Sequence, residues 1–245
     1  MDAHAILHTA ANTVALAPVA IPEPGPGQVL VETLYSCISP GTELRCLAGQ
    51  QPDAAQWPYI PGYALTGRVI AAGPETTLAT GTLVFCSGTM AASVARMWGG
   101  HVSHALQYER AVYPLPSNVD PLAAALAKLA AITYHGMRLS RPQPHEQVAV
   151  IGLGPIGQLA ARLHQLSGAR VVAADPLAER VPSPSKAAGR RCSSRVALPK
   201  PLLLFCQAAR MWLSMPPVLR RCQRRRSLWH ASYPGMMHST LARAT

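Results

Sequence analysis

Three glycines and one aspartate have the types and the spacing to bind the phosphates and the sugar of a dinucleotide. Gly152, Gly154 and Gly157 form a G-x-G-x-x-G turn directly after the apolar run 148–151. The first glycine permits a tight turn, the second lets a pyrophosphate approach the backbone, and the third lets a helix pack on a strand. Asp175 follows at about the distance, roughly 20 residues, at which a carboxylate accepts hydrogen bonds from an adenosine ribose.

The segments around this turn have the pattern of a strand–helix–strand unit. Residues 148–151 are apolar and mostly β-branched, as in a strand buried on both faces, and 170–174 have the same character. Between them the apolar residues keep helical spacing, and the N-terminus of such a helix binds phosphate through free N–H groups and its dipole. We therefore predict a cofactor site that consists of Gly152, Gly154, Pro155, Ile156, Gly157 and Asp175.

The charge of Asp175 favours NAD, because a carboxylate at this position would repel the 2′-phosphate of NADP. Arg180, five residues later, keeps NADP as an alternative, because an arginine near this position can accommodate the 2′-phosphate.

The net charge of +11 comes entirely from the last quarter of the chain. Residues 1–181 hold 10 Lys and Arg and 11 Asp and Glu, whereas 182–245 hold 12 Lys and Arg and no acid. Residues 182–245 also lack any helix or strand periodicity. We interpret them as an aberrant basic tail, typical of a truncated or frame-shifted product, with a genuine disordered basic arm as the alternative. No nucleic-acid-binding pattern accompanies the basic residues, which disfavours nucleic acid as a partner.

Cysteine spacing and hydropathy indicate the compartment. The six cysteines include no C-x-x-C pair, which argues against a disulfide framework and against a structural zinc lobe. The sequence shows no secretory signal and no run of about 18–20 apolar residues. We predict a cytoplasmic protein without membrane contact.

The first 117 residues alternate short strands with turns rich in glycine and proline, which predicts a compact β-barrel. The expected strands are 5–8, 13–19, 29–34, 64–71, 83–86 and 111–113, and 36–43 is expected to be a polar turn. A helix is predicted over 120–139, because Asp120 can cap it and Pro121 suits its first turn.

The chain to about residue 181 resembles the medium-chain dehydrogenase/reductase family. The matching segments are 22–31, Pro61-Gly62 followed by 67–69, Leu115-Pro116 and the glycine turn 152–157. Segment 35–43 with 61–63 is most similar to the bacteriochlorophyllide dehydrogenase-like branch, which lacks zinc.

The resemblance implies an α/β chain with a GroES-like β-barrel at 1–117, then a linking helix and the first β-α-β of a Rossmann domain at 118–181. The tail 182–245 is then not a domain. The implied reaction is hydride transfer between NAD(P) and a small alcohol or carbonyl compound. The family often forms homodimers through later strands of the nucleotide domain, which are not evident in this sequence.

The positions of the family's catalytic zinc ligands hold other residues here. Cys37-Ile38-Ser39 replaces a Gly-Ile-Cys, Gly62-Tyr63-Ala64 replaces a Gly-His-Glu, and the third ligand falls near Leu129. A serine, a tyrosine and a leucine do not make a zinc site, so we predict no catalytic zinc.

Without zinc, the substrate oxygen needs another hydrogen-bond donor or acid, and Thr42 and Tyr63 are the candidates. The alternatives are a turn hydroxyl and a packed tyrosine. Glu43 is expected to be structural and to pair with an arginine, and His101 and His104 to lie on a loop face.

The function predicted is thus a zinc-independent NAD(P)-dependent oxidoreductase, with turnover impaired by truncation. The alternative is a non-catalytic dinucleotide-binding or interaction protein whose basic tail contacts nucleic acid.

Overall fold

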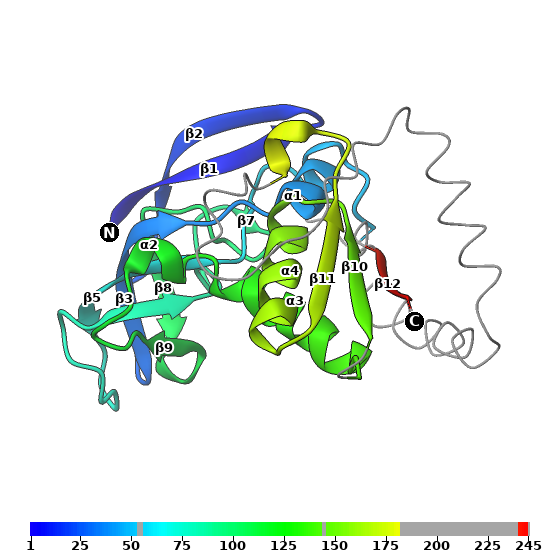
Figure 1. Cartoon of the computed structure of the whole chain (residues 1–245). Coiled ribbons are helices and arrows are strands. Elements are labelled where there is room, and N and C mark those ends of the chain that lie inside the picture. The colour runs from blue at the N-terminus through cyan, green and yellow to red at the C-terminus, as the bar shows by residue number, and fades with distance from the viewer. Residues whose placement is uncertain (53–55, 144–145, 182–239, 245) are drawn as a thin grey trace. The chain divides into compact units, whose positions relative to one another are not determined.

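The computed structural model describes residues 1–52, 56–143 and 146–181, together with the backbone of 240–244 (Figure 1). The chain divides into two compact units, Met1–Lys128 and Leu129–Thr245. The sequence predicted a boundary at 117, before the linking helix, and the division into 1–117, 118–181 and 182–245 stays a prediction.

A five-stranded antiparallel sheet forms most of the first unit, in the order β8-β3-β5-β6-β9. The strands are β3 (Gln28–Ser36), β5 (Leu65–Ala72), β6 (Leu83–Cys86), β8 (His104–Tyr108) and β9 (Val112–Pro114). A 3-10 turn, η1 (Glu109–Ala111), leads from β8 to β9. The sheet confirms the strands expected near residues 29, 64, 83 and 111.

A second sheet in this unit has the order β2-β1-β4-β7. Its members are β1 (Asp2–Ala10), β2 (Thr13–Ala20), β4 (Tyr59–Ile60) and β7 (Ala95–Arg96). The strands expected at 5–8 and 13–19 are present as β1 and β2, which pair as an antiparallel hairpin. The short strands β4 and β7 pair in parallel and were not predicted. Two-residue strands carry too little alternation to be recognised in a sequence.

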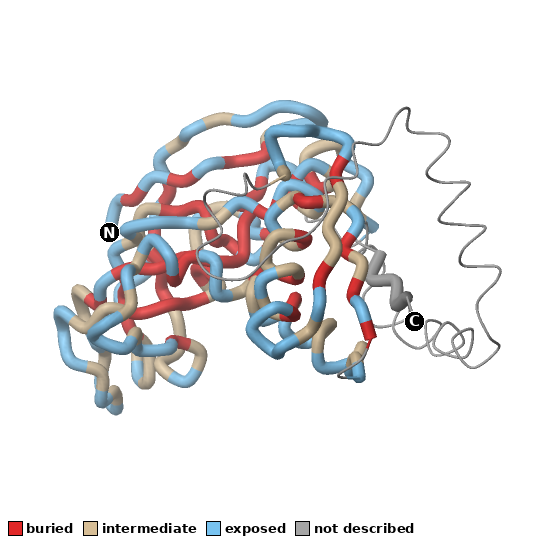
Figure 2. The backbone as a smooth tube through the Cα atoms, in the orientation of Figure 1, coloured by how far each residue is buried: buried red, intermediate tan, exposed pale blue. Residues whose placement is uncertain are grey.

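Apolar side chains from both sheets form one core (Figure 2). Val29, Val31, Leu65, Val69 and Val84 are completely buried. Aliphatic side chains of this size each contribute roughly 1.5–3 kcal/mol when they leave water. In Figure 2 the buried part of this core is the red stretch of tube that runs through β3 and β5.

A short helix, α1 (Pro40–Leu47), replaces the polar turn that was predicted for 36–43. Pro40 occupies the first helical position, where its missing N–H costs nothing. The Oε1 atom of Glu43 reaches back and accepts a hydrogen bond from the Ser39 N–H at 2.7 Å. The prediction was wrong because Ser-Pro-Gly reads as a turn, although the same residues begin a helix when an acid follows to cap it.

The helix predicted over 120–139 is present in two pieces, α2 (Pro121–Ala124) and α3 (Ala127–Ser140). Asp120 is the N-cap of α2 and accepts a hydrogen bond from the Leu122 N–H at 3.1 Å, as the sequence predicted.

The second unit contains the predicted β-α-β motif. β10 (Gln147–Ile151) and β11 (Arg170–Ala174) pair in parallel, with α4 (Pro155–Leu166) between them in the chain and the 3-10 turn η2 (Ala178–Arg180) after them. Its core consists of Val148, Val150, Leu153, Ala160 and Val171.

One further strand, β12 (Thr240–Ala244), pairs antiparallel with β10 and was not predicted. The rest of the predicted basic tail, including its arginine cluster, lies outside the described residues. Among the described residues, no helix has both the length and the apolar character needed to cross a membrane.

Candidate functional site

The glycine turn between β10 and α4 is built for the close approach of backbone atoms. Gly152 has a φ of +91°, a region open mainly to glycine, and its N–H donates to the Ala174 carbonyl oxygen at 2.8 Å. A Cβ on Gly157 would lie 1.7 Å from the Gly152 carbonyl oxygen. A Cβ on Gly154 would meet no atom of the described residues within 4 Å, so among them space is open on that side of the turn.

The N-terminus of α4 begins at this open space. Gly154 is the N-cap and Pro155 is the first helical residue. The N–H groups of Ile156 and Gly157 lie in the first turn, where no acceptor is available inside the helix. The residues therefore fit a dinucleotide: open space over Gly154, donors from the helix and a positive dipole end for a pyrophosphate.

Asp175 follows β11, and its carboxylate holds the turn itself. Its Oδ2 accepts the Leu153 N–H at 2.6 Å, its Oδ1 accepts the Leu177 N–H at 2.8 Å, and the Arg180 guanidinium lies 3.7 Å away. Burial raises the pKa of Asp175, but the two N–H donors and Arg180 outweigh burial and leave the pKa below its usual value. Asp175 is thus an anion that fastens the glycine turn to the end of β11, a role that sequence reasoning missed.

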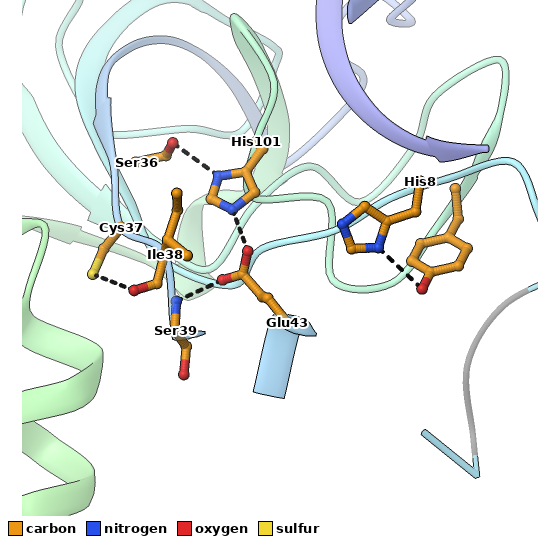
Figure 3. A network of polar contacts seen from close by, with 8 residues as sticks. His8, Ser36, Cys37, Ile38, Ser39, Glu43 and His101 are labelled. Atoms are coloured by element: carbon orange, nitrogen blue, oxygen red, sulfur yellow. Dashed lines mark hydrogen bonds and ion pairs between the residues drawn. The ribbon is translucent and has the colours of Figure 1, made fainter. Parts of the chain in front are cut away.

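In the first unit, a second group of polar side chains gathers around Glu43 (Figure 3). The Glu43 Oε2 atom lies 2.7 Å from His101 Nε2, and both side chains are more than nine-tenths buried. The other ring nitrogen, Nδ1, lies 2.9 Å from the hydroxyl of Ser36. Ser36 ends β3 and is exposed, so the network runs from the surface to a buried carboxylate.

His101 was expected on a loop face, and that prediction was wrong. The structure buries it and makes it the hydrogen-bond partner of Glu43, for which an arginine had been predicted. Gly62 allows this packing: its φ is +82°, and a Cβ there would lie 2.7 Å from the imidazole ring. No sequence signal joins Glu43 to His101, because they are 58 residues apart.

The two predicted catalytic residues, Thr42 and Tyr63, lie together beside this network. Tyr63 is buried and packs edge-on against Trp98, with ring centroids 5.2 Å apart. Burial raises the pKa of Tyr63, while hydrogen bonds with the Ser39 and Thr42 side chains partly counteract the rise. Tyr63 therefore keeps its proton at neutral pH and can donate it.

His8 lies deeper in the same unit, and its ring state follows from its partners. Its Nδ1 is 3.2 Å from the Tyr59 hydroxyl, which in turn donates to the Cys46 carbonyl oxygen at 2.9 Å. Because that hydroxyl has only one proton, His8 Nδ1 must be the donor in this pair. Burial lowers the pKa of His8, an effect opposed by nearby Glu43 and increased by His101, so the ring is neutral.

The side chains present do not fit a zinc ion. Burial and the Glu43 charge raise the pKa of the Cys37 thiol, whereas zinc binding requires a thiolate. Cys37 instead contacts the Ile38 carbonyl oxygen at 3.6 Å. Within the described parts of the chain, no group of three His, Cys, Asp or Glu side chains is arranged to hold a metal. The absence of zinc stays a prediction that rests on these residue types.

The first unit is built mainly from antiparallel strands, and the second unit contains a parallel β-α-β motif with a glycine turn of the dinucleotide-binding type. Residues 25–117 match the family model of the alcohol dehydrogenase GroES-like domain. The chain is 30% identical over 181 residues to 2-desacetyl-2-hydroxyethyl bacteriochlorophyllide A dehydrogenase of Cereibacter sphaeroides, which covers 69% of this chain and 54% of that protein.

Two solved structures have the same fold. One is described as a zinc-binding dehydrogenase of Sinorhizobium meliloti bound to NADP, with a TM-score of 0.63, 24% identity, and 74% and 58% of the two chains covered. The other is acetophenone reductase of Geotrichum candidum in complex with NAD, with a TM-score of 0.64, 21% identity, and 73% and 59% covered.

These matches confirm the predicted resemblance to alcohol dehydrogenase-like proteins, and residues 25–117 carry the GroES-like domain of that family. The chain spans about half the length of the curated relatives it matches.

Proposed function

We propose that the chain carries the barrel and the first cofactor-binding motif of an oxidoreductase that transfers hydride between NAD(P) and a small alcohol or carbonyl compound. The contact between Gly157 and the Gly152 carbonyl carries this proposal. That contact brings helix and strand together and leaves open space over Gly154, where a pyrophosphate would lie. The alcohol dehydrogenase relatives and the NAD- and NADP-bound neighbours support it.

The residues that would hold the dinucleotide are those of the turn and of the strand end. Backbone N–H groups of Gly154, Ile156 and Gly157 would donate to the phosphates, and Pro155 would fix the first helical φ angle. The Asp175 carboxylate has further lone pairs beyond those used by Leu153 and Leu177, and these would accept from the adenosine ribose.

The chemistry at the substrate oxygen would not need a metal. A bound nicotinamide would supply the site that accepts or donates hydride. Tyr63, protonated at neutral pH and hydrogen-bonded to Thr42, would donate to the substrate oxygen and stabilise the negative charge that develops there.

Titration of NADH and NADPH into the purified full chain, followed by calorimetry, tests the cofactor part of this proposal. We expect one molecule bound per chain, with the tighter binding for NADH because Asp175 is ionised. If titration with NADH and NADPH up to millimolar concentrations gives no more heat than titration into buffer alone, dinucleotide binding is refuted.

A further inference from the structure

The His101 ring forms hydrogen bonds through both of its nitrogens, and the reaction proposed above assigns no role to either. The imidazole lies between the buried Glu43 carboxylate on one side and the exposed Ser36 hydroxyl on the other (Figure 3). Both distances, 2.7 Å to Oε2 and 2.9 Å to Oγ, are those of direct hydrogen bonds. The ring therefore has one buried partner, Glu43, and one partner that is exposed to solvent, Ser36.

The partners determine which ring nitrogen carries the proton. An ionised carboxylate only accepts hydrogen bonds, and Glu43 already accepts one from the Ser39 N–H, so His101 Nε2 must donate to it. In the neutral ring, Nδ1 is then an acceptor and receives the Ser36 proton. In the protonated ring, both nitrogens donate, and the Ser36 hydroxyl turns its own proton outward.

We propose that Ser36, His101 and Glu43 form a proton relay for the proposed oxidoreductase, with Ser36 contacting the substrate oxygen. In alcohol oxidation, the substrate hydroxyl gives its proton to Ser36 Oγ while the Ser36 proton passes to His101 Nδ1. The carbon-bound hydrogen leaves with its electron pair to the oxidised nicotinamide, and a carbonyl compound forms. The imidazolium then returns its proton through Ser36 to water. Reduction reverses each of these transfers.

The other titratable groups near the relay, His8, Tyr63 and Cys37, stay uncharged at neutral pH and do not compete with His101 for its proton. His8 on β1 interacts electrostatically with both Glu43 and His101, but its own pKa is lowered by burial, so its ring stays uncharged. Burial raises the pKa of Tyr63 and of Cys37, so these groups stay protonated. Glu43 contacts the His101 ring and not the substrate, which makes Glu43 a positioning residue.

The relay depends on the proposed function, and two kinds of measurement separate them. Calorimetry with NADH tests cofactor binding alone. The two-bond ¹H–¹⁵N NMR spectrum of ¹⁵N-labelled full chain reports which nitrogen of His101 is protonated, without any turnover. We expect the Nε2–H tautomer in the wild type, and a shift of the Nδ1 resonance in Ser36→Ala with the tautomer unchanged.

Turnover is measured as deuterium transferred from [4-²H]NADH to acetophenone over hours, across pH 5–9, so that a slow rate suffices. General acid–base groups typically contribute roughly 10²–10⁴ in rate. Ser36→Ala should lower kcat at least about tenfold with little change in KM, and flatten the pH profile. Glu43→Gln should change the pH profile and also the NMR signals of His101.

Ser103→Ala is the matched control. The Ser103 hydroxyl lies 3.0 Å from Nδ1 of His104, the same kind of pair, and we expect kcat within twofold of the wild type. A neutral His101 with Nδ1–H, or wild-type kcat and pH profile in Ser36→Ala, would overturn the relay. NADH binding with no transfer to acetophenone by the wild type would count against it too, whereas absent NADH binding would refute the proposed function itself.

Discussion

Gly157 packs its Cα against the Gly152 carbonyl oxygen so closely that a Cβ on Gly157 would lie 1.7 Å from that oxygen. The neighbouring Gly154, in contrast, has a φ of −63° and open space where its Cβ would be. Two glycines of one turn therefore serve different purposes. One is required for helix and strand to meet, and the other leaves space for a ligand.

Substitution of these glycines should separate folding from binding. Gly157→Ala should destabilise the chain by about 3 kcal/mol or more, because the obstructing atom is backbone and cannot move aside. Gly154→Ala should leave the melting temperature within a few degrees and weaken NADH binding. Thermal unfolding and calorimetry measure the two effects. Equal melting temperatures for the two variants would contradict this account of the turn.

Arg180 should decide how well NADP is tolerated. Its guanidinium lies 3.7 Å from Asp175 and is half exposed, so it can meet a 2′-phosphate beside that carboxylate. A charged hydrogen bond is worth roughly 1.5–3 kcal/mol, so Arg180→Ala should weaken NADPH binding about tenfold or more and change NADH binding little. Arg170→Ala, at the opposite end of β11, is the control. An equal loss of affinity for both cofactors would argue against this role.

Tyr63→Phe tests the proposed donor to the substrate oxygen. Removing one protonated hydroxyl should lower kcat on the order of 100-fold, in the range of general acid catalysis. The ring would still pack against Trp98, so the melting temperature should change little. Tyr113→Phe, an exposed tyrosine on β9, is the matched control and should keep wild-type kcat. A similar kcat for both variants would remove Tyr63 from the mechanism.

Gly62 should be required for the position of His101. Gly62→Ala combines a residue at φ +82° with a Cβ 2.7 Å from the imidazole ring. Gly81→Ala at φ +93° imposes a similar backbone cost, roughly 1–3 kcal/mol, with nothing within 4 Å of its Cβ. Gly62→Ala should therefore unfold at lower temperature than Gly81→Ala and alone change the NMR signals of His101. Unchanged His101 signals in Gly62→Ala would show that the ring is held by other contacts.

His8 should make the chain less stable in mild acid. Its folded pKa lies below the unfolded value of 6.5, because burial disfavours the charged ring. The unfolded chain therefore takes up this proton first, and stability present above pH 6.5 is lost as pH falls through the folded pKa. His8→Asn keeps a donor for Tyr59 without titrating. Urea unfolding from pH 8 to pH 4 should show a shallower acid loss in the variant, and parallel curves would contradict the assignment.

Much of the fold could be predicted because its signals are local. Alternation in 29–34, the turn that precedes the strand 64–71, the β-branched run 148–151 and the Asp120-Pro121 start of α2 each depend on a few adjacent residues. The G-x-G-x-x-G turn was likewise predicted from spacing, and the structure gives a physical reason for two of its glycines. The cofactor role of these residues stays a prediction.

The centre of the first unit could not be predicted, because it depends on distant contacts. Helix α1 forms where Ser-Pro-Gly suggested a turn, and this brings Glu43 to His101, 58 residues away. The other ring nitrogen of His101 meets Ser36 at the end of β3. By itself the sequence determined the strand pattern, the glycine turn and the residues available for chemistry. Only the tertiary structure decided which of them meet, because burial and pairing depend on how the β-sheets fold, and local sequence does not record that.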